Sequence, residues 1–285
     1  MDLFLDLLRS LIYGVIEGIT EWLPISSTGH MILAEQVLKF SFSAEFMEMF
    51  RVVIQLGAIL AVVVMYFKKL WPFCVDNGRD SGLAKHVRWP VMRLWFKIIV
   101  ACLPAAVLGL ALDDWIDAHF YNSVVVAVML IVYGIAFILI ERRPRVPTTT
   151  KLSRITYRQA LIVGAWQVLA LIPGTSRSGS TIIGGMLCGC SRTAAAEFTF
   201  FLAIPVMFGW GVLKLIKYLM AVGLAMTATE IAVLVVGIVT AFVVSVISIK
   251  FLMGYIKKND FTAFGVYRII VGLVVLAYFG VKVLL

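Results

Sequence analysis

The hydrophobic positions of the chain form long continuous runs rather than an alternating pattern. Crossing roughly 30 Å of hydrocarbon takes about 20 apolar residues in a helix. The runs are apolar on every face, whereas the strands of a membrane barrel alternate apolar and polar residues. The pattern therefore predicts an all-α polytopic membrane protein with six spans, at about 50–68, 92–112, 122–140, 195–220, 228–250 and 262–284.

Two further apolar stretches, 3–39 and 157–191, are each interrupted by a short polar segment. The first contains "EWLPISSTGH" and the second contains "PGTSRSGST". Between Arg158 and Pro173 only about fourteen residues remain, too few to cross the hydrocarbon at 1.5 Å per residue. We expect two re-entrant helix-loop-helix pairs, a form that a bilayer tolerates only when it packs in protein or lines a wet cavity.

The two interrupted stretches resemble each other at an offset of 150 residues. The matched pairs, with the prolines one position out of register, are Gly14 and Gly164, Glu17 and Gln167, Pro24 and Pro173, Ser26 and Ser176, and Gly29 and Gly179. A re-entrant pair followed by three spans crosses the membrane an odd number of times. The second copy should therefore have the opposite orientation in the membrane. We expect an inverted repeat of residues 1–141 and 157–285, with a cytoplasmic linker at 142–156 and both loops near the midplane.

Composition and charge agree with a membrane protein. The 285 residues are 62% hydrophobic and 14% charged, whereas soluble domains carry roughly 25% charged residues. The formal charge of +9 could suggest nucleic-acid binding, but the basic residues fall between apolar runs and form no continuous stripe, so no nucleic acid is expected. The basic residues gather near 69–91, 141–157 and 251–261. The positive-inside rule places these loops in the cytoplasm and both termini on the outer side.

Two acidic residues, Glu17 and Glu21, lie one helical turn apart beside the first proline break. Burying a carboxylate at bilayer depth costs roughly 2.5–3.5 kcal/mol on insertion scales, so two of them on one face need compensation. A divalent cation, a shared proton or a nearby arginine would supply it. The alternative is a solvated position at the membrane interface, against which the apolar neighbours of both acids count.

Hydroxyl groups and a histidine follow the acids directly, in Ser26, Ser27, Thr28 and His30. A serine becomes a nucleophile when a base takes its proton, and a histidine three residues on across a glycine turn can reach back. The spacing permits Ser27 as nucleophile with His30 as base. The same residues also form a common helix N-cap and turn, so a purely structural role stays open.

The second loop, residues 173–181, places glycines and small hydroxylated residues before a helix. Backbone N–H groups in such a turn can hold an anion, and Arg177 adds a planar donor suited to phosphate oxygens. The glycine spacing mimics a P-loop, but Ser180 replaces its lysine and no soluble strand precedes it, so nucleotide hydrolysis is not expected. Alternatively, Arg177 is a structural partner of one of the buried acids.

Other polar residues indicate packing rather than chemistry. Arg192 and Glu197 lie near the second loop, where they could form an ion pair with each other, and a structural role is expected for both. Arg268 lies in an apolar run and is expected to hydrogen-bond between helices. His119 falls in a predicted loop, where a solvated side chain is expected.

At "EGITEWLPISSTGH" and "PGTSRSG" the sequence closely resembles the undecaprenyl-diphosphate phosphatases of the bacitracin-resistance (BacA or UppP) family. The likeness extends over essentially the whole chain, including "VVIQLGAILAVVVM" at 52–65. It implies hydrolysis of a C55 polyprenyl diphosphate to the monophosphate and phosphate, which recycles the carrier lipid for peptidoglycan synthesis and confers bacitracin resistance. It also implies a bacterial cytoplasmic (inner) membrane protein whose site opens to the outer face. Membrane lipid and the lipid substrate are the expected partners, and a homodimer stays open.

Carried over by position, the family's motifs assign roles to ten residues of this chain. The residues expected to be catalytic are Glu21, Ser27, His30 and Arg177. The residues expected to bind substrate are Glu17, Ser26, Thr28, Ser176, Ser178 and Thr181. A divalent cation, Mg²⁺ or Ca²⁺, is expected at Glu17 and Glu21. One departure is Arg51, which stands where related sequences often have an acid.

The resulting hypothesis is attack by Ser27 on the terminal phosphate, with His30 accepting the proton and Arg177 stabilising the transferring group. Direct attack by water, with His30 as base, is the alternative mechanism. The rival function is a polyprenyl-phosphate flippase or transporter, because inverted repeats with broken helices also build transporters. A reactive Ser27 is superfluous in a flippase, which favours the enzyme. A non-catalytic scaffold would leave the buried acids unexplained.

Overall fold

The computed structural model describes residues 3–76, 78, 81–120, 122–223 and 226–284. Helices form its regular structure, which confirms the predicted all-α class. The long helices and their connecting turns are α1 (Leu3–Thr20), α2 (Ser27–Val37), α3 (Ala44–Met65), α4 (Phe67–Leu70), η1 (Gly82–His86), α5 (Trp89–Phe120), α6 (Ser123–Arg142), η2 (Leu152–Arg154), α7 (Tyr157–Val168), η3 (Leu169–Leu171), α8 (Arg177–Leu187), α9 (Arg192–Val222), α10 (Ala228–Tyr255) and α11 (Thr262–Leu284).

Within the described ranges, six helices are long and apolar enough to cross a membrane, namely α3, α5, α6, α9, α10 and α11. They coincide with the six predicted spans, and the chain is a multi-pass membrane protein. The two largest differences from the predicted boundaries are at the start of α3 and at the end of α5. The Ser43 side chain accepts a hydrogen bond from Phe46 N and caps α3 at Ala44, about six residues before the expected start. At the other boundary α5 continues to Phe120, so His119 lies in a helix rather than a loop.

Both predicted helix breaks are present, between α1 and α2 and between α7 and α8. Each second helix begins after a serine that accepts a hydrogen bond from the glycine three residues on. Ser26 Oγ lies 3.4 Å from Gly29 N, and Ser176 Oγ lies 3.1 Å from Gly179 N. These two serines, with φ of 73° and 71°, are the only non-glycine residues at positive φ in the described chain. A positive φ costs energy in a residue with a side chain, so both turns hold local strain.

Glycines allow the helices before each break to pack closely on a span from the other half of the chain. A Cβ atom added to Gly14 of α1 would lie 2.8 Å from Gly237 O in α10. A Cβ atom added to Gly164 of α7 would lie 2.2 Å from Ala101 O in α5. Side chains at these glycines would therefore force the helices apart. Close packing brings the ends of α1 and α7, and with them both loops, into the interior.

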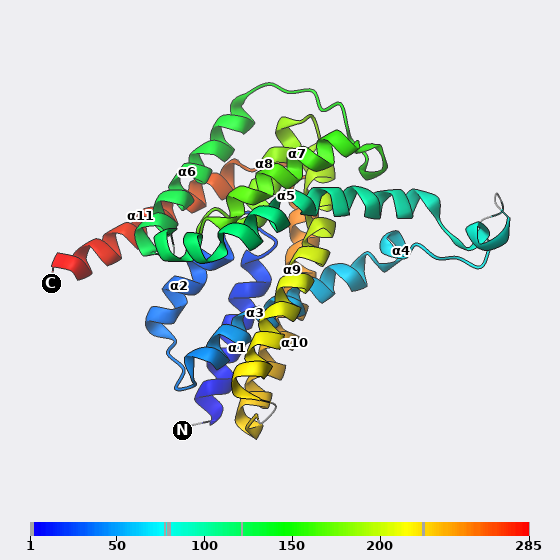
Figure 1. Cartoon of the computed structure of the whole chain (residues 1–285). Coiled ribbons are helices and arrows are strands. Elements are labelled where there is room, and N and C mark those ends of the chain that lie inside the picture. Colours follow the sequence, from blue (N-terminus) through cyan, green and yellow to red (C-terminus); the bar gives the residue numbers. More distant parts are fainter. Residues whose placement is uncertain (1–2, 77, 79–80, 121, 224–225, 285) are drawn as a thin grey trace.

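The long helices pack against one another, and α9 contacts the first loop directly. Figure 1 shows α1, α3, α9 and α10 gathered together, α6 and α11 running side by side, and η1 far out from the bundle. Trp22 in the first loop is fully buried and meets the ring of Phe200 in α9 edge-on, with centroids 5.3 Å apart. The main apolar core therefore reaches directly to the loops and holds them in place.

Candidate active site

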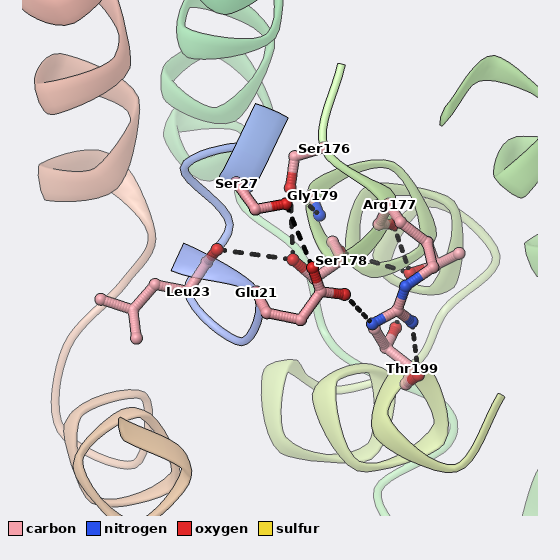
Figure 2. Close-up of polar contacts among 9 residues, drawn as sticks. Glu21, Leu23, Ser27, Ser176, Arg177, Ser178, Gly179 and Thr199 are labelled. Atoms are coloured by element: carbon pink, nitrogen blue, oxygen red, sulfur yellow. Dashed lines mark hydrogen bonds and ion pairs between the residues drawn. The ribbon is translucent and has the colours of Figure 1, made fainter. Parts of the chain in front are cut away.

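The two helix breaks meet at a cluster of charged and hydroxyl groups. Nη2 of Arg177 donates to Oε1 of Glu21 at 2.9 Å, and Oγ of Ser27 donates to Oε2 of the same carboxylate at 3.1 Å. Oγ of Ser178 donates to the carbonyl oxygen of Leu23 at 3.4 Å. Figure 2 shows Glu21 between Ser27 on its own loop and Arg177 on the other loop. The structure therefore brings the acidic, hydroxyl and arginine motifs to one place.

Arg177 is fixed by two contacts and keeps one donor without a partner. Its Nη1 donates to the carbonyl oxygen of Thr199 at 3.1 Å, while Nη2 holds Glu21. Its Nε is buried and has no hydrogen-bond partner among the described residues. Arg177 therefore pairs with one of the two buried acids, Glu21, while its Nε N–H group is left over as a donor.

A cavity of about 520 Å³ opens beside this cluster. Six of the ten predicted site residues line it, namely Glu21, Ser27, Thr28, Ser176, Arg177 and Ser178. Three further polar residues share the wall: Thr20, Gln55 and Gln167. The rest of the wall is largely apolar and comes from α5, η3 and α9. A polar end joined to an apolar wall suits a ligand with a charged head and a hydrocarbon tail.

His30 is not among the residues that line this cavity, and it contacts Ser26 and Tyr267 instead of the predicted partner, Ser27. Its Nδ1 lies 2.7 Å from the carbonyl oxygen of Ser26, and its Nε2 lies 2.7 Å from the hydroxyl of Tyr267. The two rings are parallel, with centroids 5.6 Å apart. Ser27 instead donates to Glu21. The role of His30 as a base stays a prediction, and Tyr267 is a neighbour that sequence reasoning missed.

The remaining predicted residues, Glu17, Ser26 and Thr181, are buried and also lie outside the cavity lining. Ser26 caps α2. The Thr181 hydroxyl donates to the carbonyl oxygen of Arg177 at 2.8 Å and accepts from Thr199 Oγ1 at 2.9 Å. These contacts fix the shape of the second loop. Ser26 and Thr181 thus hold the backbone that presents the cavity-lining side chains.

Arg268 ties the two loops together. It is fully buried in α11, and its guanidinium donates to the carbonyl oxygen of Pro24 at 3.1 Å and to those of Gly174 and Thr175 at 2.9 Å each. Two further bonds reach carbonyl oxygens at the middle of α6. The expected interhelical bonding of Arg268 is confirmed. A cation that binds both loops at once keeps the two breaks in register.

Glu17 and Glu21 suit a divalent cation only if a bound substrate or water supplies further oxygen atoms. Both oxygens of Glu21 are engaged by Arg177 and Ser27, whereas Oε1 of Glu17 is buried and has no hydrogen-bond partner in the part of the chain that the structure describes. The described residues contain no group of three or more His, Cys, Asp and Glu side chains able to hold a metal. Mg²⁺ is commonly bound through one or two carboxylates together with substrate phosphates and water. The unpaired oxygen of Glu17 is compatible with such a site.

Away from the cavity, Arg192 and Glu197 form ion pairs with other residues and not with each other. Arg192 donates to Glu141 of α6 through two nitrogens, and Glu197 pairs with Lys69, so Arg192 and Glu197 do not pair with each other. Both lie on α9 five residues apart, a spacing that does not bring side chains together. Arg51, the departure from the family pattern, pairs with a carboxylate of α2, Glu35. This pair links the far part of α2 to α3.

Fold and site together define a multi-pass membrane protein whose broken helices carry carboxylate, hydroxyl and guanidinium groups into one cavity. The chain belongs to the bacitracin resistance protein BacA family, whose model matches residues 10–274.

Curated relatives cover nearly the whole chain. The undecaprenyl-diphosphatase of Enterococcus faecalis strain V583 is 58% identical over 278 residues, which are 97% of this chain and 98% of the relative. The undecaprenyl-diphosphatase of Desulfitobacterium hafniense is 57% identical and covers 98% of each chain. That of Acetivibrio thermocellus is 54% identical, over 96% of this chain and 98% of the relative.

Proposed function

We propose that this protein hydrolyses undecaprenyl diphosphate to undecaprenyl phosphate and inorganic phosphate. The observation that carries the proposal is the cluster of Glu21, Ser27 and Arg177 at the polar end of a largely apolar cavity. The names of the curated relatives support the same reaction. The product recycles a carrier lipid for cell-wall synthesis, and removal of the diphosphate form gives bacitracin resistance.

Arg177 binds the terminal phosphate in this proposal. Its Nε has no partner among the described residues, and Arg177 is the first residue of α8, where the N–H groups of a helix favour anions. The hydroxyls of Thr28, Ser176 and Ser178, which line the cavity, add neutral donors. Fixed donors of this kind stabilise the charge that develops on a transferring phosphoryl group.

Ser27 is the proposed nucleophile, and Glu21 is the group placed to accept its proton. The hydroxyl of Ser27 already donates to Oε2 of Glu21. As Oγ forms a bond to the terminal phosphorus, the bond from that phosphorus to the bridging oxygen breaks, and undecaprenyl phosphate leaves. Water then attacks the phosphoserine, inorganic phosphate departs, and the serine oxygen recovers a proton.

His30 takes part in this scheme by a different route from the predicted direct contact. Its bonds to the Ser26 carbonyl and to Tyr267 connect the first loop to α11, so that His30 can fix the turn that carries Ser27. Direct attack by water, with His30 as the base, remains the alternative mechanism. That alternative requires the His30 ring to leave Tyr267, because both of its ring nitrogens are engaged.

A divalent cation, Mg²⁺ or Ca²⁺, is the proposed cofactor, and Glu17 and Glu21 are the residues that would hold it. The support is the buried, unpaired Oε1 of Glu17. When bound, such an ion neutralises negative charge on the phosphate oxygens.

The site belongs, in our proposal, to an inverted repeat of residues 1–141 and 157–285 inserted with both termini on the outer side. The matching turns at Ser26 and Ser176 support the repeat. The corresponding helix pairs also support it, since α1 packs on α10 and α7 packs on α5. The lysines and arginines of the connections near 69–91, 141–157 and 251–261 support the orientation. The cavity would then open to the outer face of the bacterial cytoplasmic membrane.

Phosphate release by the purified protein tests this proposal. In detergent, with no membrane gradient, the wild type should release phosphate from a polyprenyl diphosphate, which transport alone would not do. The variants Glu21→Ala and Arg177→Ala, checked for normal expression and melting, should lose this activity. A well-folded wild type that releases no phosphate would instead favour the flippase.

A further inference from the structure

Gln167 is a buried polar side chain with no interaction that explains its presence. It lies one residue before the end of α7, is 2% exposed, and lines the same cavity as Glu21 and Arg177. Neither Oε1 nor Nε2 has a hydrogen-bond partner among the described residues. A buried amide without partners destabilises a protein, and native structures rarely keep one without reason.

The surroundings fix Gln167 relative to the second loop. The carbonyl oxygen of its neighbour Trp166 accepts a hydrogen bond from Ser180 of α8. A Cβ atom on Gly184 would lie 2.5 Å from the Trp166 ring, so α7 and α8 pack closely here. The end of α7 is therefore locked to the helix that begins with Arg177. Gln167 occupies a set position in the cavity wall.

The charges of the cavity explain why a neutral donor suits this position. Among the described residues that line the cavity, Arg177 is the one cationic side chain, and it is already paired with Glu21. A diphosphate carries more negative charge than one paired arginine balances, so additional donors are needed. An amide can donate two hydrogen bonds through its N–H groups, and because it carries no charge it does not form an ion pair with Glu21.

We propose that Gln167 binds the diphosphate head group, with Nε2 donating to a non-bridging phosphate oxygen and Oε1 accepting from a water molecule or a protonated phosphate oxygen. The inference rests on the proposed function, because it takes a lipid diphosphate as the ligand of the cavity. It makes Gln167 a substrate-binding residue that comes before the α7–α8 loop and complements Arg177, which follows that loop.

The test compares Gln167→Leu with a matched control, Ser245→Ala. Ser245 is also fully buried with an unpaired oxygen, but it lies in α10 outside the cavity lining. Both substitutions remove an unpaired polar group, so the melting temperature should stay the same or rise in both. We expect kcat/KM for phosphate release to fall about 10- to 100-fold in Gln167→Leu and to stay unchanged in Ser245→Ala, because hydrogen bonds to charged groups are the strong ones.

A binding measurement separates this inference from the proposed reaction. Farnesyl diphosphate should raise the melting temperature of the wild type in detergent, and the rise should shrink in Gln167→Leu. If the wild type is stabilised but releases no phosphate, and the stabilisation is lost in Gln167→Leu, hydrolysis is refuted while the binding role stands. If the wild type is neither stabilised nor active, both are refuted.

Retention of wild-type activity and ligand stabilisation in Gln167→Leu would overturn the inference. Should that variant fail to fold, the isosteric Gln167→Glu decides, because it keeps a polar end and sets a carboxylate against the phosphate. We expect kcat/KM of Gln167→Glu to fall by at least the 10- to 100-fold expected for Gln167→Leu. Wild-type kcat/KM in folded Gln167→Glu would contradict the proposal.

Discussion

Oε1 of Glu21 lies 2.9 Å from Nη2 of Arg177, although 156 residues separate the two along the chain. Both side chains are largely buried, with 8% and 12% exposed. Desolvation makes such a pair a poor source of stability, since two well-packed apolar side chains would often do as well. The pair is better explained by chemistry, because it holds a carboxylate and a guanidinium ready around one cavity.

The substitution Glu21→Gln tests the acid. The amide keeps the size of the side chain but loses the base for Ser27 and leaves the Arg177 charge unpaired. We expect phosphate release to fall by about 100-fold or more, a typical loss for a general base, with a lower melting temperature as well. The exposed Glu45→Gln is the control and should behave as the wild type. Equal rates in the two variants would exclude Glu21 from the chemistry.

Ser27 is tested by trapping the covalent intermediate. Rapid acid quenching of the wild type with a lipid labelled in its terminal phosphate should leave label on the protein at Ser27, located by mass spectrometry. Ser27→Ala should carry no label and should lose most of its activity. Full turnover in Ser27→Ala would favour direct attack by water.

Because Arg268 binds carbonyl oxygens of both loops, we expect its removal to lower the stability of the protein. Arg268→Met should leave several buried carbonyl groups without a donor, each worth about 1–3 kcal/mol, and should lower the melting temperature markedly. Arg143→Met changes an exposed arginine and serves as the control. Phosphate release should fall along with stability, since the two breaks lose their common anchor. An unchanged melting temperature would show that the loops are held by other contacts.

Metal removal tests the proposed cation. Treatment with EDTA should abolish phosphate release, and added Mg²⁺ or Ca²⁺ should restore it. Glu17→Gln should raise the ion concentration needed for half-maximal activity, because one carboxylate ligand is lost. Undiminished activity in excess EDTA would remove the cation from the proposal.

The sequence predicts the elements of this fold better than their ends. Long apolar runs mark the six spans, because only such runs can lie in hydrocarbon. Polar residues inside apolar runs likewise mark both helix breaks. The extension of α5 to Phe120 was missed, since a helix satisfies its own backbone and can continue past the apolar boundary.

Partners of the site residues were harder to predict than the residues themselves. Glu21, Ser27 and Arg177 stand out because charged and hydroxyl groups are costly in a membrane. The partner of His30 lies 237 positions away in α11, and no local spacing indicates it. Arg268 was expected to bond between helices, but its five carbonyl partners depend on how three distant segments pack. Such contacts follow from the tertiary arrangement and leave no local pattern.

The central claim is that both loops act on one phosphate group, and a double-mutant cycle in kcat/KM tests it most directly. Phosphate release is measured for the wild type, Glu21→Gln, Arg177→Met and the double variant, with each protein shown to be folded. Residues that act as a unit give strongly non-additive losses, so the double variant should be about as slow as the slower single variant. Losses that multiply, as for two independent sites, would contradict the account.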